Sequence, residues 1–215
     1  MRNKFEKQLV MLNNELIEMG NLIEQAITMA VAALVQQNTT TAKEAIAFDH
    51  EINEQEKKIE ALCLKLLLQQ QPVARDLRLI SAALKMITDM ERIGDHAADI
   101  SEITILLAEE SSINLLEIIQ SMAKETTDMV VKSIEAFVNR DLELAHCVIK
   151  QDDRVDALFV TLRKEIIEMI NEKVEKGEQA TDVLMIGKYF ERIGDHATNI
   201  AEWVIFAMTG QHDEA

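Results

Sequence analysis

Residues 91–102 read ERIGDHAADISE, and residues 191–202 read ERIGDHATNIAE. Nine of the twelve positions are identical, at a constant offset of 100 residues. A chance match occurs about once in fifteen positions at ordinary composition, so two unrelated segments do not agree this well. The chain is therefore predicted to be a tandem repeat whose period is near half its length.

On a helix, each copy of this segment has an apolar stripe and an acidic face. The stripes, expected to face the core, are Met86, Met90, Ile93, Ala97, Ile100 and Thr104, and Ile186, Phe190, Ile193, Ala197, Ile200 and Val204. The acids opposite them are Glu91, Asp95 and Glu102, and Glu191, Asp195 and Glu202. Like charges four residues apart destabilise a helix by about 0.2–0.5 kcal/mol per pair. A bound cation would reverse that effect; the alternative is a face that is simply solvated.

Carboxylates four residues apart on a helix are spaced for hard cations with oxygen ligands, such as Mg, Ca, Mn or ferric iron. One helix supplies too few ligands, so a second helix must contribute. The best candidates are Asp49 with Asn53 for the first copy, and Asp152 with Asp156 for the second. We expect two related sites that are not identical, because an asparagine in one matches an aspartate in the other.

The composition of the 215 residues is that of an acidic, globular, helical protein. Hydrophobic residues make up 48% and charged residues 28%, and there is one proline. The net charge of −16 argues against nucleic acid and anionic membranes as partners, and favours cations or basic protein surfaces. The sequence has no secretion signal and no apolar run long enough for a membrane span, which predicts a cytoplasmic location. Cys63 and Cys147 lack metal-binding spacing, and both are expected in a core.

Apolar periodicity predicts an all-α fold of six long antiparallel helices, arranged as two pseudo-symmetric three-helix bundles. The expected helix ranges are 4–37, 42–70, 73–109, 113–140, 142–176 and 180–208, in domains 1–110 and 111–215 joined at 111–112. A threonine of 39–41 and Asp141 are the expected N-caps, and Pro72 can open the third helix. Asp76 suits a first turn, and Gly177 and Gly210 are the expected helix ends.

His96 and His196 follow the motif aspartates and lie at the edge of the predicted core stripe. They could be metal ligands or phosphorylated histidines, but a hydrogen bond to a neighbouring acid is the favoured interpretation. The motif arginines are expected to pair with nearby carboxylates, and the motif glycines to permit close helix approach. No nucleophile with an adjacent base is evident, so we do not expect an enzyme.

The doubled ERIGD motif, the segment QPVARDLRLI at residues 71–80 and the six-helix repeat together resemble the PhoU family. The resemblance covers essentially the whole chain. It implies a cytoplasmic negative regulator of phosphate uptake and phosphate-regulon signalling. Such a protein is an adaptor between the ATPase of the phosphate ABC transporter and a phosphate-sensing histidine kinase, and we expect a homodimer.

The resemblance also implies metal ions at the acidic motifs, with iron, manganese, magnesium or zinc as candidates. Carried onto this sequence, the implied ligands are Glu91, Asp95, Glu191, Asp195, Asp49, Asp152 and Asp156. Asn53 stands where a carboxylate is expected, which puts full occupancy of the first site in question. The alternative function is a metal-dependent, di-iron-like helical-bundle enzyme or an iron-binding protein.

Overall fold

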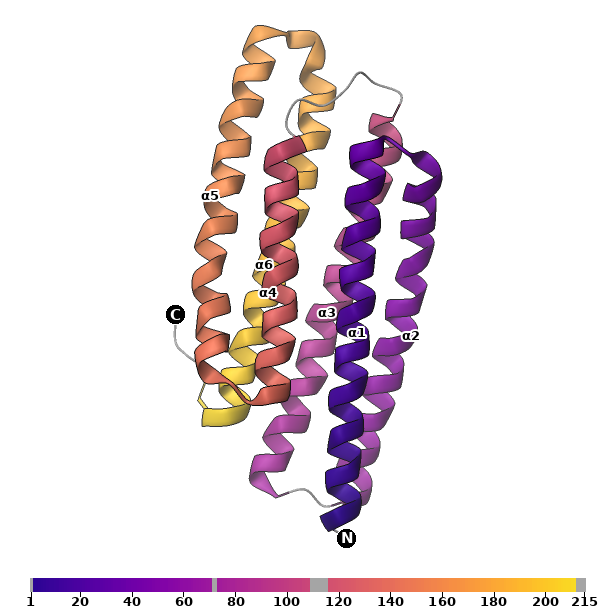
Figure 1. Cartoon of the computed structure of the whole chain (residues 1–215), viewed down its shortest axis with the longest axis vertical. Helices are drawn as coiled ribbons and strands as arrows, with labels where there is room; N and C mark the ends of the chain where they lie inside the picture. Colours follow the sequence, from indigo (N-terminus) through magenta and orange to yellow (C-terminus); the bar gives the residue numbers. More distant parts are fainter. Residues whose placement is uncertain (1, 71–72, 109–115, 212–215) are drawn as a thin grey trace.

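The computed structural model describes residues 2–70, 73–108 and 116–211, and within these residues the chain forms six α-helices and one short 3-10 turn. The elements are α1 (Arg2–Gln36), α2 (Thr39–Gln70), α3 (Ala74–Leu107), α4 (Leu116–Asn139), α5 (Leu142–Glu172), η1 (Val174–Lys176) and α6 (Gly177–Thr209). All the helices run along the long axis of the molecule (Figure 1). None of the described helices combines the length and the apolarity that a membrane span needs.

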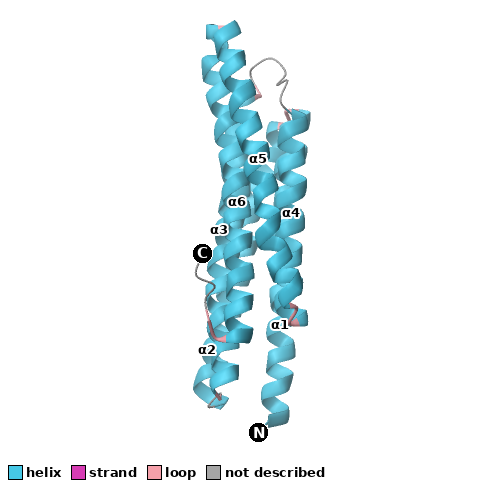
Figure 2. Ribbon diagram, turned by 90° about the vertical axis from the view of Figure 1, so that its left-hand side faces the viewer, coloured by secondary structure: helices cyan, strands magenta, loops and turns pink. Residues whose placement is uncertain are grey.

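The helices form two three-helix bundles that lie side by side. Helices α1, α2 and α3 pack on one another, and so do α4, α5 and α6. The bundles are joined by α3 against α6 and by α1 against α4. Figure 2 shows α1 and α4 together along one side of the molecule. The prediction of an all-α fold with two three-helix units is confirmed.

The two predicted apolar stripes lie in the core. Ile93 and Ile193 are fully buried, and the other ten stripe positions are at most 2% exposed. Thr104 tolerates this burial because its hydroxyl donates to the carbonyl oxygen of Ile100 at 2.9 Å. Phe190 is among the largest fully buried side chains, and truncating such a residue to alanine costs about 3–5 kcal/mol. Because these stripes sit on α3 and α6, the motif helices form the centre of the molecule.

Several predicted helix boundaries are confirmed. The carboxylate of Asp141 caps α5 by accepting from the backbone N–H of Leu144 at 3.0 Å. Asp76 lies in the first turn of α3. Gly210 ends α6 with φ of +80°, a left-handed conformation that suits glycine.

Two boundary predictions are wrong. Asn38, and not a threonine, caps α2: its Oδ1 accepts from the backbone N–H groups of Thr40 at 3.0 Å and Thr41 at 3.2 Å. The helix therefore begins before the predicted residue 42, at Thr39. Gly177 does not end α5. Its φ of −59° is helical, so it begins α6 after the 3-10 turn, while α5 already ends at Glu172.

The two cysteines differ in exposure, so the expectation that both lie in a core is wrong for one of them. Cys63 is buried, whereas Cys147 is exposed on α5; neither forms a disulfide. Pro72, the junction at residues 111–112 and the boundary between the predicted domains lie outside the described residues.

Candidate metal centres

The first acidic cluster forms where α2 crosses the motif glycine of α3. A Cβ atom added to Gly94 would lie 2.8 Å from Cδ1 of Ile52 and 3.2 Å from Oδ1 of Asp49. Glycine therefore lets α2 approach closely enough for the carboxylate of Asp49 to rest on the α3 backbone. The prediction that this glycine permits close helix approach is confirmed.

Three carboxyl groups of this cluster, Asp49 and Glu56 on α2 and Glu91 on α3, have a raised pKa. Burial, followed by the charge of Asp95, raises the pKa of Asp49. Burial and Asp95 also raise the pKa of Glu91. Burial, followed by Glu60, raises the pKa of Glu56, with a smaller contribution from Asp95. Burial is the largest cause for all three groups, and the negative charge of Asp95 adds to it in each.

Asp49 has one satisfied and one unsatisfied oxygen. Its Oδ2 accepts a hydrogen bond from Nδ2 of Asn53 at 2.6 Å. Its Oδ1 is buried and has no hydrogen-bond partner within the described part of the chain. A buried carboxylate oxygen without a partner is costly, and a cation is one group that would satisfy it.

The second cluster repeats this arrangement between α5 and α6. A Cβ atom on Gly194 would lie 3.0 Å from Oδ1 of Asp152, so the same close approach recurs. Burial, followed by the charges of Asp156, Asp195 and Glu191, raises the pKa of Asp152 to about 6. The other three predicted ligands of the second site thus all act on Asp152. The second cluster is the better candidate for a metal site, because it has the carboxylate of Asp156 where the first cluster has the neutral amide of Asn53.

Basic side chains occupy part of each cluster. Nη1 of Arg92 donates to Oδ2 of Asp95 at 2.9 Å, and Nε of Arg92 lies 3.5 Å from Glu91. Lys188 pairs with Glu191 in the second cluster. Across the described ranges, no three His, Cys, Asp or Glu side chains are grouped so that they could hold a metal ion. The carboxylate oxygens have the right chemistry for a hard cation. In this structure, however, the motif acids form ion pairs with Arg92 and Lys188.

Comparison with known proteins places this geometry in a family. The model of the PhoU domain matches the chain twice, at residues 16–104 and 119–204. The chain belongs to the PhoU family. Each match contains one motif helix together with the helix that carries its partner carboxylates.

Relatives cover nearly the full length of this PhoU chain. A phosphate-specific transport system accessory protein PhoU homolog of Clostridium acetobutylicum is 37% identical, over 98% of this chain and 96% of its own. The homolog of Pseudomonas aeruginosa is 33% identical, over 96% and 86%. The relatives are named accessory proteins, which confirms that the chain is not an enzyme.

Solved PhoU structures have the same fold. The crystal structure of PhoU from Pseudomonas aeruginosa superposes with a TM-score of 0.91 at 32% identity, covering 96% of this chain and 100% of that one. The phosphate transport system regulatory protein PhoU from Streptococcus pneumoniae also gives 0.91, at 28% identity, covering 98% and 100%.

The motif histidines lie together at the contact between the two PhoU repeats. The ring centroids of His96 and His196 are 5.6 Å apart. Nδ1 of His96 lies 3.3 Å from Oδ2 of Asp99, and burial lowers the pKa of this histidine. Nδ1 of His196 lies 2.8 Å from Oδ1 of Asp89, which belongs to the other repeat. Both histidines therefore have an acid partner, as the sequence indicated.

The sequence did not reveal that each motif histidine contacts a residue of the other repeat. The residue one repeat length after Asp89 is Tyr189, whose ring centroid lies 5.3 Å from that of His96. Each repeat thus presents one position to the histidine of the other: an aspartate to His196 and a tyrosine to His96. The constant offset links these two positions, but only their location across the α3–α6 contact identifies them as histidine partners. The guanidinium of Arg192 lies 5.8 Å from the Tyr189 ring centroid, and its expected pairing with a carboxylate is not seen among the described residues.

Proposed function

We propose that this protein is a negative regulator of phosphate uptake and phosphate-regulon signalling, acting through contacts with other proteins. The observation that carries the proposal is full-length membership of a family whose relatives are named accessory proteins of phosphate-specific transport. The partners proposed are the ATPase of the phosphate ABC transporter and a phosphate-sensing histidine kinase. A cytoplasmic location and a homodimeric form belong to the same proposal.

The two acidic clusters are proposed as metal sites that support this role. Glu91, Asp95 and Asp49 would hold a cation between α2 and α3, and the second repeat would do the same with Glu191, Asp195, Asp152 and Asp156. The proposal is supported by the unsatisfied Oδ1 of Asp49 and by the raised pKa of Asp49 and Asp152. A bound iron, manganese, magnesium or zinc ion would neutralise the carboxylates. For this to happen, Arg92 must release Asp95 and Lys188 must release Glu191.

Replacing Asp95 and Asp195 together with alanine tests both halves of this proposal. The purified variant, loaded with each candidate metal and then desalted, should lose metal measured by elemental analysis. In cells lacking the native gene it should also fail to hold down a phosphate-regulon reporter in phosphate-rich medium. Metal at 100 times its dissociation constant should stabilise the wild type by about 2.7 kcal/mol for each occupied site, and the variant by much less.

The matched control removes two exposed charges far from the clusters, with Glu165→Ala and Glu168→Ala on α5. This control should keep both metal and repression. Unchanged metal content in the Asp95 and Asp195 variant would refute the metal assignment. Full repression by a metal-free variant would separate regulation from metal binding. Loading with many iron ions per chain would instead favour an iron-binding protein.

A further inference from the structure

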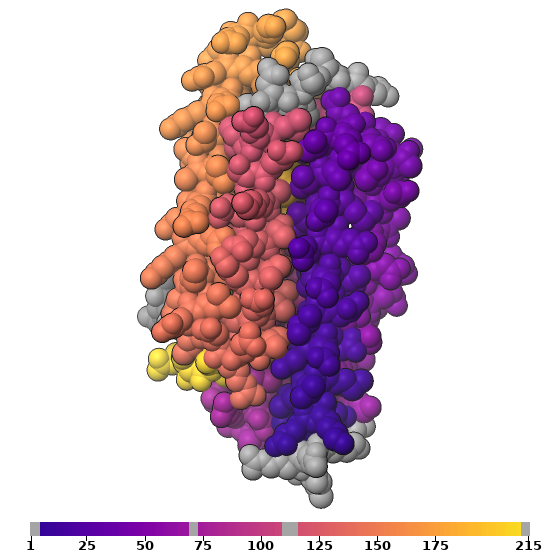
Figure 3. Space-filling model, viewed as in Figure 1, coloured from indigo at the N-terminus to yellow at the C-terminus, as the bar shows by residue number. Residues whose placement is uncertain are grey.

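An open groove runs between α1 and α4. These two helices form the second contact between the PhoU repeats, apart from the contact of the motif helices α3 and α6. Two adjoining hollows of about 290 and 750 Å³ form it, and Glu24 and Val131 line both. One end is lined by Ile17 and Asn139, the other by Gln36 and Gln120, so the two helices are antiparallel. In Figure 3 the groove follows the boundary between the indigo α1 and the salmon α4.

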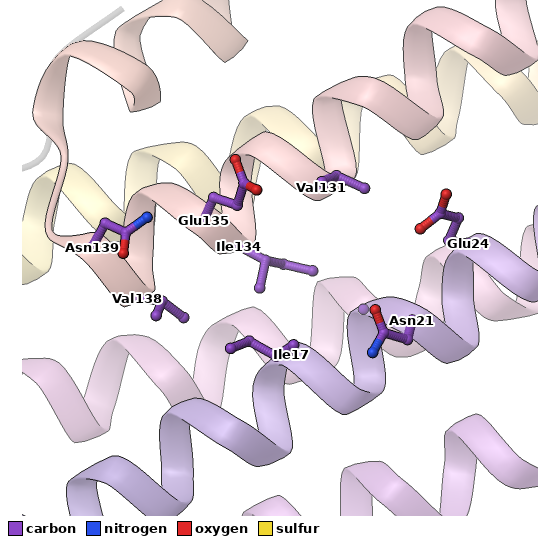
Figure 4. A pocket seen from close by; sticks show the side chains of 9 residues that line it. Ile17, Asn21, Glu24, Val131, Ile134, Glu135, Val138 and Asn139 are labelled. Atoms are coloured by element: carbon purple, nitrogen blue, oxygen red, sulfur yellow. The ribbon is translucent and has the colours of Figure 1, made fainter.

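The floor of the groove is apolar. A Cβ atom on Gly20 would lie 2.7 Å from Cδ1 of Ile134, so α4 packs directly on the α1 backbone here. Ile17 is 42% exposed and Val35 is 38% exposed, one at each end of the α1 stripe that faces the groove. Figure 4 shows Ile17, Ile134 and Val138 converging on the hollow. A continuous strip of branched apolar side chains along a groove is typical of a surface that receives another helix.

The rim of the groove is acidic. Glu24 on α1 and Glu135 on α4 are exposed, and no ion pair to either is found among the described residues. Asp128, further along α4, already pairs with Lys132. The one basic residue that lines the two hollows is Lys124. The occupant that matches this rim carries positive charge beside its apolar face.

We propose that the α1–α4 groove is the docking surface for an amphipathic helix of a partner protein, with Lys or Arg flanking its apolar stripe. The groove spans residues 17–36 of α1, about 28 Å at 1.5 Å per residue, which is the length of about five helical turns. A second copy of this chain does not fit as well, because it would bring the same acidic rim and a net charge of −16. The inference rests on the proposed adaptor function and names the surface through which it acts.

A synthetic helix tests the groove directly. The probe is a fluorescein-labelled peptide of about 19 residues, with leucines at i, i+3, i+4 and i+7 and lysines beside them, titrated with full-length protein at low ionic strength. Fluorescence anisotropy should report saturable binding, and methyl NMR should place it at Ile17 and Ile134. The double variant with Glu24→Lys and Glu135→Lys should bind about tenfold more weakly.

Two controls separate recognition from general charge attraction. Glu165→Lys with Glu168→Lys changes the net charge by the same amount on exposed α5 positions, and should alter the peptide affinity by less than about twofold. A peptide with glutamates in place of its lysines should bind the wild type poorly. The same peptide should bind the Glu24→Lys, Glu135→Lys variant with about the affinity that the lysine peptide has for the wild type. This reciprocal rescue is the signature of direct contact, because long-range attraction does not require matched positions.

Equal weakening by the groove variant and the α5 control, or methyl shifts confined to another face, would overturn the proposal. So would a monomer–dimer equilibrium that the groove variant abolishes, since the surface would then join copies of this chain. Metal content and peptide binding are measured on the same preparations. An Asp95→Ala, Asp195→Ala variant that loses metal yet binds the peptide leaves the groove standing, whereas a groove variant that keeps metal and full affinity overturns the groove alone.

Discussion

Replacing Asp152 with asparagine should stabilise the metal-free protein above pH 6. Burial, followed by Asp156, Asp195 and Glu191, raises the pKa of this carboxyl from 3.8 to about 6. The folded protein therefore holds a proton that the unfolded chain releases between about pH 4 and pH 6. Across that window the wild type loses stability as the pH rises, and above it the loss is complete. Asparagine cannot ionise, so the variant avoids this loss.

The size of the effect follows from the pKa shift. A shift of about two units corresponds to about 3 kcal/mol at 1.36 kcal/mol per unit. Asp152 is only half-buried, and water screens part of the repulsion, so we expect about 1–2 kcal/mol at pH 8. For a chain of this size that raises the melting temperature by about 2–8 °C. At pH 4 the variant and the wild type should be nearly equal.

Urea unfolding in chelator, followed by circular dichroism at pH 4 and pH 8, measures this difference. Glu165→Gln, which removes one exposed charge from the same helix, controls for net charge and should leave the stability within about 0.5 kcal/mol of the wild type. Adding metal at pH 8 should reverse the order, because the wild type gains stability and the variant loses a proposed ligand. A variant no more stable than the wild type at pH 8 would refute the reasoning from charge repulsion.

Two further perturbations probe the repeat contact and the cysteines. Asp89→Ala should lower the free energy of unfolding by about 1–2 kcal/mol in urea titrations at pH 7, because His196 of the other repeat loses its acceptor. Asp99→Ala removes a 3.3 Å contact within one helix from a side chain that is 38% exposed, and should cost less than about 0.5 kcal/mol; equal losses would contradict the cross-repeat role. A thiol reagent at pH 7.5 should label Cys147 in the native protein, whereas burial raises the pKa of Cys63 to about 12, so Cys63 should react only on unfolding. Mass spectrometry of tryptic peptides distinguishes the two, and rapid native labelling of Cys63 would contradict its burial.

Apolar periodicity predicted the helices and their buried faces, because the spacing of apolar residues within one helix can be read directly from the sequence. The stripe of Ile93 and the stripe of Ile193 are buried as expected, since a 3.6-residue repeat of apolar side chains has one way to leave water. Helix ends were less predictable. Glycine is common at the C-terminal end of a helix, but Gly177 lies in an ordinary helical conformation at the start of α6. The long α5 instead ends five residues earlier, at Glu172, in a stretch without a glycine or a proline.

The acidic clusters were predictable in part. The motif acids and their partners on α2 and α5 follow from spacing and from the repeat, and the structure brings each pair of helices together over its glycine. The salt bridges of Arg92 and Lys188 decide how the carboxylates point without metal. That choice depends on rotamers and on distances between helices, which spacing along one helix does not specify.

The repeat, the six helices, the buried stripes and the acidic faces could all be read from the sequence, because each is a pattern in the order of residues along the chain. The contact of Asp89 with His196 across the repeats, and the acid-rimmed groove between α1 and α4, appear only once the helices are packed together. These features depend on how one bundle is rotated and shifted against the other. That arrangement is set by the packing of large buried side chains far apart in the chain, and no single helix carries it.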